Sequence, residues 1–188
     1  MPAWGVFPPL HGLAFGCFGS FTLYWGGEIV AVPNRKAREL LALLFARGGG
    51  PLHKLTAAQT LWPGADEDHA MDSLYKACGV LRRMIRAGIP IPLEIRRDVL
   101  TLDIRKLDSD VKQFEALYQR RQDIVCCQAA VTLYKGPFLF DEYYEWTAQT
   151  EAYYDLRYME LLEILARRLS EQGAPEAAYY RMLLGQGR

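Results

Sequence analysis

One predicted helix carries basic residues at a spacing that could contact an anion. Within residues 69–87, Lys76, Gly79 and Arg83 recur three to four positions apart and therefore share one helix face. Lysine and arginine suit guanine edges and phosphates, and a glycine lets a groove approach closely. An ordinary solvated helix face has the same pattern. The chemistry that we predict is contact with double-stranded DNA, with a solvated face as the alternative.

Neighbouring positions on this helix extend the basic face. Tyr75 suits contact with a phosphate or a thymine methyl group, and Gly88 and Pro90 end the helix. The predicted DNA-binding residues on the helix are Tyr75, Lys76, Gly79, Arg82, Arg83 and Arg86.

Other cations lie where the chain is expected to turn. Arg96 and Arg97 occupy the predicted tip of a β-hairpin and suit a backbone or minor-groove contact, although such charges can also keep an edge strand soluble. Helix starts also carry the cations Arg35, Lys36 and Lys54, although the helix dipole disfavours positive charge there. Thr56 can cap a helix and donate to a phosphate. These additional predicted DNA contacts are Arg35, Lys36, Lys54, Thr56, Arg96 and Arg97.

The sequence offers little for catalysis. His11, His53 and His69 are scattered without metal-binding spacing, and there is no phosphate-binding loop or G-x-S-x-G motif. The acidic run 66–68 is better explained as a helix start than as a metal site. We therefore expect no enzyme activity, no cofactor and no metal.

Charge and cysteine usage narrow the protein class. The formal net charge is zero, but residues 33–106 carry a balance of +5 and residues 107–188 one of −4, so only the first of these segments suits an anionic partner. The four cysteines form no C-x-x-C pair, which is typical of a reduced cytoplasmic protein. No apolar run is long enough to cross a membrane, and the N-terminus lacks a signal-peptide pattern.

The elements that must position the basic residues can be read from periodicity. Short apolar runs within residues 13–32, with a Gly26-Gly27 turn, predict two or three antiparallel strands. Helices are expected after the Asn34 cap, over 56–62 with Thr56 as cap, and over 69–87, followed by two strands around the turn 96–98. The predicted packed residues are Phe15, Phe18, Phe21 and Leu23 in the strands and Leu40, Leu41, Leu44 and Phe45 in the first helix.

The remainder of the chain has helical periodicity. After a cap at Asp108 or Ser109 we expect helices over 111–122, 124–135 and 143–172, and a last one from about 174. Such helical hairpins resemble a tetratricopeptide stack. The tyrosines of this region favour a packed core and a dimer interface over a ligand pocket, and one member of a pair such as Tyr143-Tyr144 must be exposed.

The ordered segments resemble a known family. RKARELLALLFARGG, LTAAQTLWPG, SLYKACGVLRRMI and LEIRRDVLTLDI resemble the OmpR/PhoB-type winged helix of SARP-type bacterial transcriptional regulators. LDSDVKQFEAL, LYKGPFL and EWTAQTEAYYDLRYMELLEILARRL resemble the bacterial transcriptional activator domain that accompanies it. The resemblance covers about residues 13–184. In one departure, Val80 stands where many members carry a polar or basic residue, which weakens base readout there.

The resemblance implies an α+β fold, with a winged helix-turn-helix followed by an all-α, tetratricopeptide-like domain. The expected division is a flexible lead-in over 1–12, a DNA-binding domain over 13–106 and a helical activator domain over 107–188, which we expect to be truncated. It implies a transcriptional activator that binds promoter DNA as a homodimer and contacts RNA polymerase, in a family that also serves two-component signalling. Alternatives are a helical module whose winged helix binds a protein, and a small-molecule sensor.

Overall fold

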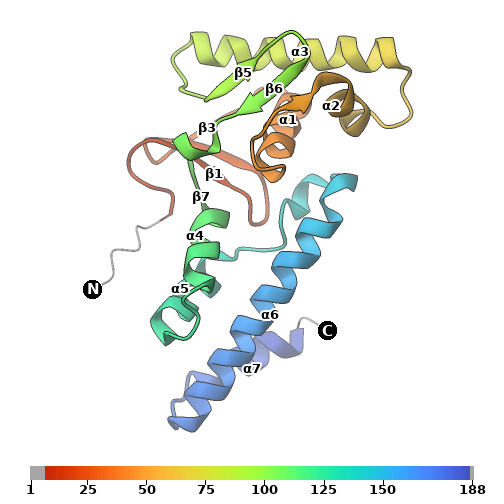
Figure 1. Cartoon of the computed structure of the whole chain (residues 1–188). Coiled ribbons are helices and arrows are strands. Elements are labelled where there is room, and N and C mark those ends of the chain that lie inside the picture. The colour runs from red at the N-terminus through yellow and green to blue at the C-terminus, as the bar shows by residue number, and fades with distance from the viewer. Residues whose placement is uncertain (1–6, 187–188) are drawn as a thin grey trace. The chain divides into compact units, whose positions relative to one another are not determined.

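A computed structural model of the chain describes residues 7–186, which form two compact units of mixed α+β structure (Figure 1). The first unit holds residues 7–16 and 21–108, and the second holds 17–20 together with the chain from 109 onward. Residues 1–6 of the expected lead-in lie outside the described residues. Its described part contacts the first unit, since the rings of Phe7 and Tyr24 lie 5.6 Å apart.

The first unit begins with the antiparallel strands β1 (Leu13–Gly16), β2 (Thr22–Trp25) and β3 (Glu28–Val30). The short β7 (Asp108–Ser109), where the chain passes from the first unit to the second, completes the sheet order β3-β2-β1-β7. Phe15 pairs with Leu23 across β1 and β2. Gly26 and Gly27 both have positive φ and make the predicted turn between β2 and β3. The predicted strands are thus confirmed.

The inner face of this sheet contributes to the core of the first unit. The ring of Phe15 lies 5.0 Å from that of Phe21 and 5.6 Å from that of Phe45, and Leu23 is buried. The prediction that Phe18 shares this face is wrong. Phe18 follows the end of β1, and its ring packs in the second unit against Phe114.

Three helices follow: α1 (Arg35–Ala46), α2 (Lys54–Leu61) and α3 (Glu67–Arg86). Asn34 caps α1 as predicted, because its side chain accepts from the amide of Ala37 at 2.9 Å. The predicted cap at Thr56 is wrong. The strand β4 (Leu52–His53) leads directly into α2, so His53 is the N-cap and Thr56 lies inside the helix.

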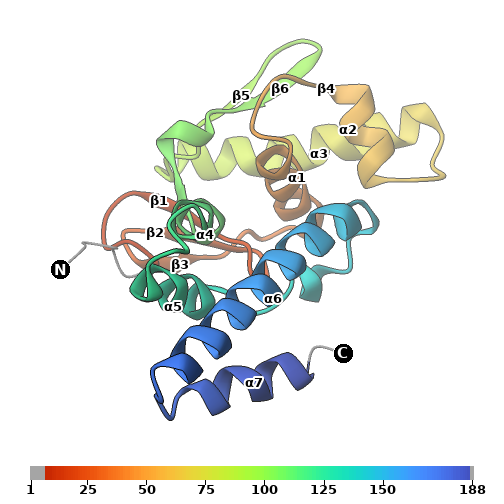
Figure 2. The ribbon, with the colours of Figure 1, turned by 60° about the horizontal axis from the view of Figure 1, so that its bottom comes forward.

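A second sheet has the order β4-β6-β5, with β5 (Leu93–Ile95) and β6 (Val99–Leu102) forming the predicted hairpin. The amide of Arg96 donates to the carbonyl of Val99 at 3.0 Å and closes the turn 96–98. Figures 1 and 2 show this hairpin alongside α3. Gly49 anchors the sheet to the end of α1. Its φ is +74°, and a Cβ atom there would lie 2.1 Å from the carbonyl oxygen of Leu102, so only glycine fits.

The second unit is helical. Its helices are α4 (Asp110–Tyr118), α5 (Ile124–Leu133), α6 (Ala148–Glu171) and α7 (Ala177–Gln186); the short 3-10 turns of the chain are η1 (Ile104–Lys106) in the first unit, and η2 (Phe140–Glu142) and η3 (Glu145–Thr147) in the second. Ser109 caps α4 as predicted. The long helix begins later than predicted, because Tyr143 adopts a left-handed conformation with φ of 53° that a helix cannot accommodate.

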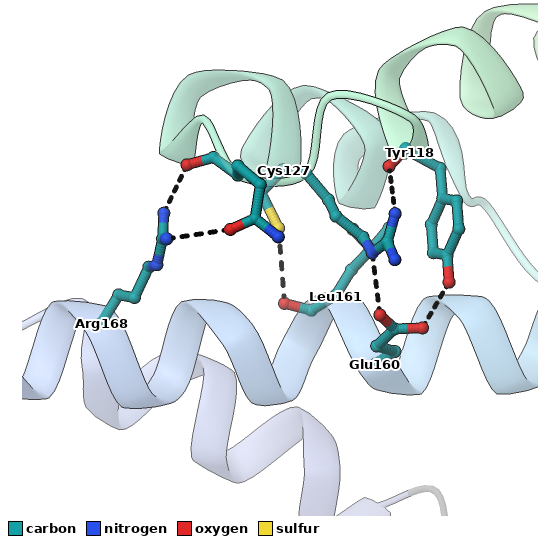
Figure 3. A network of polar contacts seen from close by, with 7 residues as sticks. Tyr118, Cys127, Glu160, Leu161 and Arg168 are labelled. Atoms are coloured by element: carbon teal, nitrogen blue, oxygen red, sulfur yellow. Dashed lines mark hydrogen bonds and ion pairs between the residues drawn. The ribbon is translucent and has the colours of Figure 1, made fainter.

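These helices pack in sequence order, α4 against α5, α5 against α6 and α6 against α7, and Figure 2 shows α7 folded back along α6. A polar network joins α6 to the region of α4 and α5 (Figure 3). Glu160 accepts from the Tyr118 hydroxyl and pairs with Arg121 at 2.8 Å, and Arg168 donates to Gln122 at 3.2 Å. The second unit therefore satisfies these charges internally.

The segment 17–20 is held within the second unit by the buried carboxylate of Asp110. Both its oxygens accept from the amide of Cys17, at 2.8 and 2.9 Å, and one also accepts from Phe18 at 3.0 Å. Burial, opposed by these amide donors, raises the pKa of Asp110 to about 6. The four cysteines of the chain are buried and form no disulfide. Among the described residues, no helix has the length and apolar character to span a membrane.

Candidate nucleic-acid interface

Helix α3 forms because its start, its apolar stripe and its charge distribution agree. Asp66 caps it by accepting from the amide of His69 at 3.0 Å, and acidic residues occupy the first turn while Arg83 and Arg86 lie in the last, as the helix dipole favours. The side facing the core carries Ala70, Leu74, Ala77, Cys78, Leu81 and Met84. The opposite side is left to solvent.

An open groove of about 670 Å³ runs along this exposed side. Its lining residues are Asn34, Asp72, Tyr75, Lys76, Gly79, Val80 and Arg83. The three charged residues Asp72, Lys76 and Arg83 follow one another down the same helix face, so a single carboxylate stands among cations. Gly79 lines this groove without contributing a side chain.

The cations of this face form no internal ion pair, although the Asp72 carboxylate lies on the same face. Lys76, Arg82, Arg83 and Arg86 are exposed, and none forms an ion pair with another residue between 7 and 186. Solvent ions can therefore gather around them. Neutralising such a set with phosphates would release those counterions, which is the main source of affinity for nucleic acid.

The hairpin turn 96–98 lies in the same unit and is exposed. Arg96 pairs with Glu94 through its Nε atom at 2.7 Å, while Arg97 forms no ion pair with a described residue. Exposed pairs of this kind contribute little stability and exchange readily for another anion. Both arginines can therefore meet a phosphate, and Arg97 needs to give up no partner.

The structure places Lys54 differently from its predicted role as a direct contact. The residue is buried, its ammonium group donates to the carbonyl oxygen of Arg97 at 2.7 Å, and it lies 5.1 Å from the centre of the Tyr75 ring. Tyr75 itself is 48% exposed and lines the groove. Lys54 thus acts between the groove and the hairpin turn and does not face solvent.

The remaining predicted contacts lie at the edge of the groove or beyond it. Lys36 is half-buried, pairs with Glu39 at 2.8 Å and donates to the carbonyl of Leu61 at the end of α2. Arg35 is exposed at the first position of α1, next to the groove residue Asn34. Thr56 is exposed in α2 but does not line the groove.

The predicted contacts did not include three of the groove residues, Asn34, Asp72 and Val80. Asp72 had a signal, since it precedes Lys76 by four positions and therefore shares its face. Asn34 had none beyond its capping role, because only the packing of α1 beside α3 brings it to the groove. Val80 is 9% exposed, so at this position the groove has an apolar edge. Over the described part of the chain, no cluster of potential metal ligands is found.

Of the comparisons with known proteins, the one with solved structures gives a match. No family model matches the sequence, and no curated protein does. Among solved structures, the fold is similar to that of Mycobacterium tuberculosis EmbR in complex with a low affinity phosphopeptide, with a TM-score of 0.68 and 21% identity over 85% of this chain. The chain spans 48% of that protein's length. At this identity the likeness shows a shared fold, which supports the mixed α+β architecture.

Proposed function

We propose that this chain is a sequence-specific DNA-binding transcriptional regulator, with no enzymatic activity, that activates at promoters. The observation that carries the proposal is the set of four exposed cations on α3 that form no ion pair with a described residue, beside a groove lined by Gly79. A stripe of this kind is the electrostatic footprint of a nucleic-acid surface.

In this proposal the first unit is a winged helix-turn-helix. Helix α3 enters the major groove, where its arginines reach base edges and phosphates, and the β5–β6 hairpin is the wing that places Arg96 and Arg97 against the backbone or minor groove. The order of three helices followed by a hairpin supports this assignment, as does the fold shared with EmbR over most of the chain. Arg35 extends the basic surface at one edge of the groove.

The second unit, a tetratricopeptide-like helical domain in this proposal, supplies the protein contacts. Large apolar side chains remain exposed on it: Tyr143 is 79% exposed, Leu156 73% and Tyr179 53%. Exposed aromatic residues of this kind are typical of protein interfaces. We assign this surface to homodimerisation, to signal reception and to contact with RNA polymerase at the promoter, in the bacterial cytoplasm.

Selection from a pool of random duplex DNA, carried out at two salt concentrations, tests the proposal. The purified chain should enrich a motif repeated at a fixed spacing, and binding to that motif should weaken steeply with salt because phosphate contacts release counterions. The spacing of the repeats would give the dimer geometry. A scrambled duplex of the same length and composition is the control.

Absence of both enrichment and salt-sensitive binding would contradict the proposal. It would favour the alternative that the winged helix binds a protein partner, an alternative that the solved complex of EmbR with a phosphopeptide makes specific enough to test. Binding of phosphorylated or unphosphorylated peptide pools to the same chain would then support a protein-binding function in place of DNA binding.

A further inference from the structure

We propose that Lys54 is a positioning residue that ties the wing turn 96–98 to the groove face of α3, and that it does not itself contact DNA. The inference rests on the proposed function for its DNA-binding consequence, but its structural part concerns the protein alone. Its basis is the juxtaposition of one buried ammonium group with the wing turn and with the ring of Tyr75.

Both the backbone and the side chain of Lys54 hold the wing turn. The Lys54 amide donates to the carbonyl of Asp98 at 2.9 Å, and its ammonium donates to the carbonyl of Arg97 at 2.7 Å. The strand β4 directly before it pairs with β6, with His53 opposite Val99. Two consecutive turn carbonyls are thus fixed by one residue that follows the partner strand.

The same ammonium group connects the turn to α3. It lies over the Tyr75 ring at 5.1 Å, a cation–π geometry, and the ring in turn lines the groove. Because Lys54 is 6% exposed, this charge is shielded from water, and a carbonyl oxygen and a ring face take the place of its hydration. A buried ammonium with these partners fixes the distance between Arg97 and Tyr75.

A direct DNA contact for Lys54 is inconsistent with this placement. To reach a phosphate the side chain would have to leave the Arg97 carbonyl and the Tyr75 ring, and the part-buried hydrogen bond and the cation–π contact would both be lost. The exposed Lys76 can reach DNA without such a loss. The two lysines therefore serve different purposes, although both stand beside the groove.

The clamp can be tested first on the free protein, without DNA. Lys54→Met keeps the aliphatic stem and removes the ammonium, and Lys76→Met is the matched control. In Lys54→Met, amide hydrogen exchange at Arg96, whose amide closes the turn, should accelerate about tenfold or more, because local opening becomes easier. Exchange within α3 should stay unchanged, and Lys76→Met should leave the turn as protected as in the parent. Unchanged exchange in a folded Lys54→Met would overturn the clamp.

A measurement on the parent covers the case in which Lys54→Met does not fold. The Lys54 ammonium should give a slowly exchanging NMR resonance with a scalar coupling through the hydrogen bond to the Arg97 carbonyl carbon. A rapidly exchanging ammonium without that coupling overturns the proposal.

DNA affinity measured in double variants provides the third test of the proposal. If Lys54 acts through the wing, Lys54→Met in an Arg96→Ala/Arg97→Ala background should weaken binding no further, whereas Lys76→Met and the Arg96→Ala/Arg97→Ala double change should add. Full additivity of Lys54→Met with the Arg96→Ala/Arg97→Ala double change would identify Lys54 as an independent contact and overturn its positioning role. If no variant binds DNA differently because the parent does not bind it, the proposed function fails and the exchange result still decides the clamp.

Discussion

Two sets of arginines, one in each unit, differ in their partners. In the second unit Arg121 pairs with Glu160 at 2.8 Å and Arg157 pairs with Glu115, with Arg157 also stacked between two tyrosine rings at 4.1 and 4.3 Å. In the first unit Arg82 and Arg83 on α3 are exposed and form no ion pair within residues 7–186. The paired arginines of the second unit serve helix packing, whereas Arg82 and Arg83 of α3 remain available to an external anion.

This difference distinguishes arginines that stabilise the fold from arginines that are available for binding. A paired and stacked arginine contributes to folding, so its removal should be seen in stability. An exposed and unpaired arginine contributes almost nothing to folding, so its removal should be seen only in binding. Mutations of the two sets of arginines should therefore change different quantities: stability for the paired set and DNA affinity for the unpaired set.

The largest expected effect tests the unpaired set. Replacement of Arg82 and Arg83 together by alanine should weaken promoter-type DNA binding by about 4 kcal/mol, or roughly a thousandfold at moderate salt, because each arginine contributes about 1–3 kcal/mol. The slope of log affinity against log salt should fall by about two if both contact phosphates. The midpoint of thermal unfolding should change little, since only the favourable place of Arg83 near the helix C-terminus is lost. Fluorescence titration and calorimetry can check affinity and stability together.

Lys135 and Arg167 provide a control with the same loss of charge. Both are exposed in the second unit. Their double alanine variant should lose little affinity at moderate salt, since only the long-range field changes. Equal affinity losses in the two double variants would break the comparison, because the effect would then follow net charge and not the α3 face.

The next effect concerns Asp110, a buried acid of the second unit. Its pKa is raised by burial from 3.8 to about 6, so the folded state holds the proton more tightly than the unfolded chain. The resulting stabilisation is complete below the unfolded pKa and is lost as pH rises through the folded one. At about 1.4 kcal/mol per unit, the free energy of unfolding should lose about 3 kcal/mol from this group between pH ~4 and pH ~7.

Asp110→Asn isolates this contribution. The variant removes the titration, so the parent's unfolding free energy minus that of the variant should fall by the same amount over this range. Denaturant unfolding at several pH values measures it. A difference that does not depend on pH would show that the amide donors of Cys17 and Phe18 hold the carboxylate ionised despite burial.

A smaller effect tests the paired set. Glu160→Ala removes the acceptor of the Tyr118 hydroxyl and of Arg121, and should lower stability by about 1 kcal/mol, since Glu160 and Arg121 are partly exposed. DNA affinity should stay the same. Glu163→Ala, three positions along α6 and exposed, should change neither quantity. Lost DNA affinity with unchanged stability in Glu160→Ala would contradict the assignment of this network to folding.

The elements that the sequence predicted well are those with local signals. The start of α3 followed from the acidic run at Asp66, and the hairpin turn followed from two short apolar runs around residues 96–98. The two-residue strand β4 carries no periodicity, and its pairing with β6 depends on residues more than forty positions away. The interpretation of Thr56 as a cap therefore failed, and the burial of Lys54 beside the turn could not be predicted, for the same reason.

Within the groove, the predicted contacts include the cations but not Asp72, the acid on the same helix face, and Asp72 gives the smallest and most selective test. Asp72→Asn removes the one negative charge that lines the groove while nearly preserving side-chain size. Nonspecific DNA affinity at low salt should rise by a few fold, since like-charge repulsion at an exposed site is worth at most about 1 kcal/mol. Asp68→Asn is the control, because Asp68 is an exposed acid of the same helix that does not line the groove. If Asp72→Asn and Asp68→Asn raise affinity equally, the groove face has no privileged contact with DNA. A rise confined to Asp72→Asn would place the phosphates or bases against this face, where the unpaired arginines stand.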